Sequence, residues 1–150
     1  MTIYTKVLVA IDLTDESELV VKRASQLVRP EGEILALHVL EPIDSVYTGE
    51  AFGATAMQIN GIQEDLVSQA KLRLAGFSAK YQIPKENQKL LLGRPAKEIR
   101  DYATSQDAEV IIIGTHGKHG FELLLGSTAN GVLHGAPCDV LAVRIPKKPK

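Results

Sequence analysis

Several features of specialised proteins are scarce in this chain of 150 residues. The single cysteine, Cys138, excludes an internal disulfide framework and fits a reducing compartment. No apolar run approaches the roughly 20 residues of a membrane-spanning helix. The apolar stretch between Lys6 and Asp12 is also too short for a secretory signal. We therefore expect a soluble, cytoplasmic protein without a membrane partner.

Charge gives no indication of a nucleic-acid partner either. The formal net charge is −1, and the one basic cluster, Lys147, Lys148 and Lys150, is best interpreted as a solvated tail. With 45% apolar residues, the chain is long enough for one domain over residues 1–150 that buries roughly 70% of the surface of the unfolded chain. Two independent domains are not expected.

Short apolar runs without alternation indicate strands that are buried on both faces of a parallel sheet. Between these runs, apolar residues recur at helical spacing, and residues 42–61, which show no period, are expected to form a long loop. This alternation predicts a single doubly wound α/β domain with helices on both faces of the sheet. The expected strands are Val7 to Ile11, Ile34 to Leu40, Lys89 to Leu92, Val110 to Ile113 and Asp139 to Ile145.

Four helical segments are expected between these strands. The first carries a buried face at Val20 and Ala24 and is ended by Pro30 and Gly32. The others are expected from Ile62 to about Tyr81, from Pro95 onward, and from about Thr128 to His134.

The stretch from residue 110 to residue 128 joins a buried strand to a loop with several glycines and then to a helix start, which is the pattern of a phosphate site. Glycine spacing excludes two common versions of such a site. No two glycines stand two apart, so there is no G-x-G-x-x-G, and the pair Gly126 and Gly131 is followed by Val132 where a P-loop has lysine. Any phosphate site here is of another kind.

The remaining pattern is Gly114-x-x-Gly117, eight residues, then Gly126-Ser127-Thr128. With it, the chain resembles the universal stress protein family, whose ATP-binding members carry G-x-x-G, nine residues, then G followed by Ser or Thr. The resemblance implies an adenine nucleotide alpha hydrolase-like fold, a five-stranded parallel sheet of order 3-2-1-4-5. It extends to the segments Lys6 to Asp12, His38-Val39, Asp107 to Val110, and Gly135 to Val143.

The resemblance also implies a ligand, ATP or AMP, at the carboxyl ends of the first and fourth strands. Asp12 would contact adenine, Val39 would line the adenine and ribose pocket, and the glycines with Ser127 and Thr128 would hold ribose and phosphates. Glycines allow close approach of backbone N–H groups, and hydroxyls suit phosphate or a bound Mg²⁺. The nucleotide-binding residues expected are Ala10, Ile11, Asp12, Val39, Gly114, Thr115, His116, Gly117, Lys118, Gly126, Ser127 and Thr128.

The loop is one residue shorter than the family's ATP-binding pattern, which leaves two alternatives open. The chain is either a nucleotide-binding sensor or switch of the stress response, or a nucleotide-free dimeric interaction module of the universal stress protein A type. Slow nucleotide hydrolysis is a third hypothesis, although no motif places a base or nucleophile and no catalytic residue is expected.

Two further expectations concern metal ions and self-association. His116 and His119 lack a third ligand nearby in sequence, so no metal site formed by protein side chains is expected. The resemblance implies a homodimer through the last strand, at Val140, Leu141, Ala142 and Val143. An apolar strand at the edge of a sheet favours such pairing.

Overall fold

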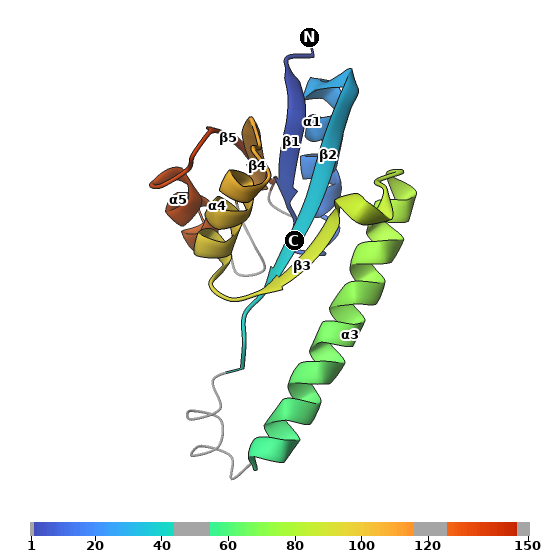
Figure 1. The fold of residues 1–150 in the computed structure, drawn as a ribbon, viewed down its shortest axis with the longest axis vertical. Helices are drawn as coiled ribbons and strands as arrows, with labels where there is room; N and C mark the ends of the chain where they lie inside the picture. The colour runs from blue at the N-terminus through green and yellow to red at the C-terminus, as the bar shows by residue number, and fades with distance from the viewer. Residues whose placement is uncertain (1, 44–54, 116–125, 147–150) are drawn as a thin grey trace.

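The computed structural model describes residues 2–43, 55–115 and 126–146, and the fold is described for these residues. Its centre is a five-stranded parallel sheet with the order β3-β2-β1-β4-β5 (Figure 1). The predicted α/β architecture and strand order are therefore confirmed. The strands are β1 (Tyr4–Ala10), β2 (Val28–Leu40), β3 (Gln88–Leu92), β4 (Val110–Gly114) and β5 (Asp139–Val143).

Helices cover both faces of this sheet, with α1 and α3 on one side and α4 and α5 on the other (Figure 1). None of the helices in the described ranges is long and apolar enough to cross a membrane. The helices are α1 (Ser17–Leu27), α3 (Ala56–Lys80), α4 (Pro95–Ser105) and α5 (Ser127–Leu133), with a 3-10 turn η1 (Lys85–Asn87) before β3.

The two faces of the sheet form two separate cores because successive strand residues point to opposite faces. In β1, Val7 and Val9 pack against α1, while Leu8 packs on the α4 and α5 side, and all three are fully buried. In β4, Ile112 and Ile111 divide in the same way. Central strands covered on both faces therefore need continuous apolar runs, as the sequence shows.

The start of β2 differs from the prediction. Pro30 and Gly32, expected to separate helix from strand, both lie inside β2, which follows α1 without a gap. The pairing of β1 with β2 shifts register between Tyr4 and Lys6, and proline is tolerated at such an irregularity. A Cβ on Gly32 would stand 2.6 Å from the Thr5 carbonyl oxygen, so this close approach requires glycine.

The long helix α3 also begins earlier than predicted, at Ala56 instead of Ile62. Its start is a capping box, in which the Thr55 hydroxyl accepts from the Gln58 N–H and the Gln58 side chain accepts from the Thr55 N–H. The predicted loop over residues 42–61 is therefore wrong in its last part, and residues 44–54 lie outside the described residues. Smaller differences are that β5 ends at Val143 and that Tyr81 follows α3.

Candidate functional site

A cavity of about 620 Å³ lies over the carboxyl ends of β1, β2 and β4. This is where ligands bind in doubly wound sheets, because the connections that follow neighbouring strands at the winding reversal run to opposite faces of the sheet and leave a crevice. All but one of the predicted site residues in the described ranges line it. They are Ala10, Ile11, Asp12, Val39, Gly114, Gly126, Ser127 and Thr128.

Thr115 is the exception, because its polar groups join neighbouring segments. Its N–H donates to the Val143 carbonyl at 2.9 Å, and its carbonyl accepts from the Gly126 N–H at 2.7 Å. The hydroxyl accepts from the Ile145 N–H at 3.2 Å. Thr115 thus ties β4 to β5 and brings Gly126 beside the strand end. His116, Gly117 and Lys118, also predicted, lie outside the described residues.

Asp12 lies in a tight turn that fixes one of its two carboxylate oxygens. Asp12 Oδ1 accepts from the Thr14 N–H at 3.0 Å, the Thr14 hydroxyl at 2.6 Å and the Ser17 hydroxyl at 2.7 Å. Leu13 between them has φ 63°, a left-handed conformation that is uncommon for leucine. The local hydrogen bonds of Asp12 offset that strain and leave Oδ2 as the oxygen without a partner among the described residues.

Beside this turn, the hydrogen-bond ladder between β1 and β2 ends. Ile11 N–H donates to the Leu37 carbonyl at 2.9 Å, so the polar backbone groups of Leu37 face β1. Gly93 N–H donates to the Leu40 carbonyl at 3.1 Å, so those of Leu40 face β3. Because facing alternates along a strand, the N–H and C=O of Val39 face β1. At that level β1 has already turned away at Asp12.

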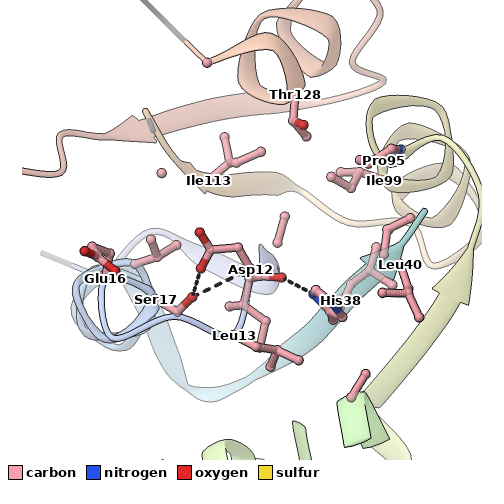
Figure 2. A pocket seen from close by; sticks show the side chains of 18 of the residues that line it. Asp12, Leu13, Glu16, Ser17, His38, Leu40, Pro95, Ile99, Ile113 and Thr128 are labelled. Carbon is pink, nitrogen blue, oxygen red and sulfur yellow. Dashed lines mark hydrogen bonds between the residues drawn. The ribbon is translucent and has the colours of Figure 1, made fainter. Parts of the chain in front are cut away.

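The His38 side chain forms a hydrogen bond with the last carbonyl of this ladder, that of Ile11. Its Nδ1 lies 2.8 Å from the Ile11 carbonyl oxygen, as the dashed line in Figure 2 marks. A carbonyl can only accept, so Nδ1 carries the hydrogen and His38 is the donor. His38 also lines the cavity.

The cavity reaches over both faces of the sheet, as Figure 2 shows with Asp12 between Ile113 and Thr128 on one side and Leu13 and His38 on the other. Sequence reasoning did not anticipate that α3 would form part of the wall. The signal was present, since four residues at i, i+3, i+4 and i+7 share one helical face. They are Leu66, Gln69, Ala70 and Arg73.

Among the described residues, neither the cysteine nor a metal-binding group of side chains lies at this cavity. Cys138 lies away from it, and burial raises the pKa of its thiol, which disfavours the nucleophilic thiolate. In the described part of the chain, no three His, Cys, Asp or Glu side chains form a group that would hold a metal ion. The arrangement is therefore suited to binding through backbone groups, carboxylates and hydroxyls. The carboxylates that line the cavity are those of Asp12, Glu16 and Glu41, and the hydroxyls are those of Ser17, Ser127 and Thr128.

Residues 3–144 match the sequence signature of the universal stress protein family. The chain belongs to this family. Among curated members, universal stress protein A homolog 2 of Coxiella burnetii is 37% identical over 144 residues, which cover 95% of this chain and 96% of that protein. The family assignment thus extends over almost the whole sequence, as the motifs predicted.

Solved structures of the family share the fold. The hypothetical protein MJ0577 superposes with a TM-score of 0.79 at 24% identity, covering 97% of this chain and 99% of that one. A universal stress protein solved in complex with cAMP superposes with a TM-score of 0.58 at 21% identity, covering 95% and 98% of the two chains. At these identities the likeness supports the fold, and cAMP is a ligand of that protein.

Proposed function

We propose that this universal stress protein binds an adenine nucleotide, ATP or AMP, in the cavity and acts in the cytoplasm as a sensor or switch of the stress response. The observation that carries the proposal is the open end of the β1–β2 ladder. There the backbone N–H and C=O of Val39 face the gap left by β1, close to the turn that carries Asp12.

A backbone N–H beside a C=O complements the edge of adenine. The ring nitrogen N1 accepts a hydrogen bond, and the neighbouring 6-amino group donates one, so adenine pairs with both groups of Val39 at once. The Oδ2 of Asp12, which has no partner among the described residues, is a second acceptor for a donor group of the ligand. Guanine, which offers a carbonyl at the 6 position and an N–H at N1, has the opposite pattern, so a guanine in the orientation of adenine would leave both Val39 groups unsatisfied.

The other end of the cavity suits ribose and phosphate. Gly114 and Gly126 let a ligand approach the backbone, and Ser127 and Thr128 supply hydroxyls. In Figure 2, Thr128 lies across the cavity from the Asp12 turn. The same hydroxyls are suited to Mg²⁺ bound with a triphosphate. The fit of these residues therefore supports a nucleotide better than a free base.

The first experiment asks whether the purified protein carries nucleotide. Protein is denatured and removed, and the supernatant is chromatographed; a stoichiometric peak of ATP or AMP supports the proposal. Calorimetric titration of stripped protein with ATP and with GTP then measures affinity and discrimination. An empty supernatant together with no heat from ATP would instead favour the nucleotide-free interaction module that the shortened loop suggests.

A pair of variants localises the site. Asp12→Asn removes the carboxylate charge at the position assigned to the ligand contact, and a charge-assisted hydrogen bond contributes roughly 1.5–3 kcal/mol, so we expect ATP affinity to fall about tenfold or more. Asp15→Asn removes an exposed carboxylate three residues along the chain that does not line the cavity. Equal affinity in both variants would place the nucleotide elsewhere.

A further inference from the structure

We propose that His38 is a positioning residue that keeps the polar backbone groups of Val39 available for the ligand. The inference rests on the proposed function, because Val39 is the residue assigned there to adenine. In a regular parallel ladder, the bond after Ile11 N–H to Leu37 C=O runs from Val39 N–H to Ile11 C=O. Among the described residues that bond is absent, and His38 Nδ1–H occupies the Ile11 carbonyl at 2.8 Å.

At the Ile11 carbonyl, the His38 side chain is the donor in place of the Val39 backbone N–H, and this has two consequences. It satisfies the Ile11 carbonyl, which belongs to a buried residue with 5% of its surface exposed and would otherwise need another partner. It also leaves the ladder open at this level, because the Ile11 carbonyl accepts from His38 and not from the Val39 N–H. His38 therefore holds the end of β1 in place, and the N–H and C=O of Val39 stay available to the cavity.

The alternation of side chains along β2 makes this arrangement possible. Leu37 and Val39 pack on the α4 and α5 side, so the His38 side chain projects to the opposite face of the sheet. From there it reaches the Ile11 carbonyl without entering the space in front of Val39. A ligand at Val39 and the His38 ring thus use opposite faces of the same strand end.

The test compares two replacements of His38. His38→Asn keeps a short side-chain N–H near the position of Nδ1, whereas His38→Leu keeps the volume and removes the donor. We expect His38→Leu to lower ATP affinity roughly tenfold, the effect of one lost hydrogen bond, and His38→Asn to stay within about threefold of the wild type. His38→Phe serves as the second donor-free variant where His38→Leu does not fold.

A second readout needs no nucleotide. Scalar coupling across a hydrogen bond, between the Val39 amide nitrogen and the Ile11 carbonyl carbon, reports whether the ladder has closed. We expect none in the wild type or in His38→Asn, and a measurable coupling in His38→Leu. Coupling in the wild type, or its absence in the donor-free variants, would overturn the role of His38.

The two readouts separate the inference from the proposed function. A coupling that is absent in the wild type and present in His38→Leu, together with no ATP binding by the wild type, would retain His38 as the residue that holds the ladder open and would reject the nucleotide. Wild-type protein that binds ATP, with His38→Leu binding it equally well, would reject the inference and leave the nucleotide site standing.

Discussion

The Ser17 hydroxyl holds both the backbone and the side chain of Asp12. It donates to Asp12 Oδ1 at 2.7 Å and accepts from the Asp12 N–H at 3.2 Å. Ser17 is the first residue of α1 and only 2% of its surface is exposed. One buried hydroxyl therefore fixes the direction of the carboxylate and joins the end of β1 to the helix that follows.

Ser17→Ala should weaken both the fold and the site. It removes two hydrogen bonds and leaves the Asp12 N–H without its Ser17 partner, so we expect a loss of about 1–3 kcal/mol in the free energy of unfolding, measured by urea denaturation. ATP affinity, measured by calorimetry, should fall roughly fivefold as the carboxylate loses one of its three donors.

Ser25→Ala is the matched control on the same helix. The Ser25 hydroxyl donates to the Val21 carbonyl at 3.1 Å, but the residue is exposed and does not line the cavity. Its replacement should change the free energy of unfolding by less than about 0.5 kcal/mol. Equal losses in Ser17→Ala and Ser25→Ala would show that the Asp12 turn does not depend on Ser17.

Two glycines inside α3 offer a prediction about stability alone. Gly61 and Gly76 are exposed, and a Cβ added to either would meet nothing within 4 Å. Glycine costs a helix interior roughly 0.5–1 kcal/mol relative to alanine, so Gly61→Ala and Gly76→Ala should each stabilise the protein by about that amount in thermal and urea unfolding.

Gly131 in α5 is the contrasting case. A Cβ there would lie 2.7 Å from the Cβ of Ala96 in α4, so the two helices would have to move apart. Gly131→Ala should therefore destabilise the protein by about 1–3 kcal/mol in the same measurements, despite the better helix propensity of alanine. A stabilising effect would mean that the contact between α4 and α5 is looser than the structure has it.

The sequence predicted the sheet well because burial on both faces leaves a plain mark. Val110 to Ile113 is an unbroken apolar run, and only a central parallel strand requires one. The ends of elements were harder to predict. Pro30 and Gly32 normally interrupt structure, and only the neighbouring strand decides that they stay extended inside β2.

The candidate site divides in the same way. Asp12 and Gly114 were predicted because carboxyl ends of parallel strands meet at one edge of the sheet. The roles of Ser17 and His38 were not, because both depend on a turn that passes through a left-handed leucine, Leu13. The contacts around Leu13 set this conformation, and a leucine in the sequence gives no indication of it.

We propose that the protein forms a homodimer by pairing β5 with its symmetry mate. Val143 accepts from the Thr115 N–H, so its polar groups face β4, and by alternation those of Ala142 face outward from the sheet edge. Ala142→Pro removes that outward N–H while leaving the bonds to β4 in place. Light scattering after size exclusion should show a wild-type dimer and a monomeric variant.

The matched control is Leu92→Ala on β3, the opposite edge of the sheet, where the side chain is 48% exposed. It should leave the mass unchanged if the interface lies on β5. A monomeric wild type at tens of micromolar would reject the homodimer, and a dimer that persists in Ala142→Pro would move the interface away from this strand.

The ion pair between Glu18 and Lys80, which joins α1 to α3, predicts how stability depends on pH. The hydrogen bond from Lys80 lowers the pKa of the Glu18 carboxyl, and the same bond raises the pKa of Lys80. A lowered carboxyl pKa adds stability above the ordinary pKa of glutamate, and this is lost as pH falls through the folded value. The contribution of Lys80 is lost only as pH rises through its own raised pKa.

Glu18→Gln should therefore unfold at a lower urea concentration than the wild type at neutral pH, and the two midpoints should converge in strong acid. The difference should be small and should shrink with added salt, because both side chains are exposed to solvent and their attraction is screened. Glu64→Gln, at an exposed position of α3 with no ion pair among the described residues, should shift the midpoint less at every pH. An effect of the carboxylate charge must disappear when Glu18 is protonated. A midpoint difference for Glu18→Gln that stayed constant from neutral pH into acid would therefore assign the effect to lost packing.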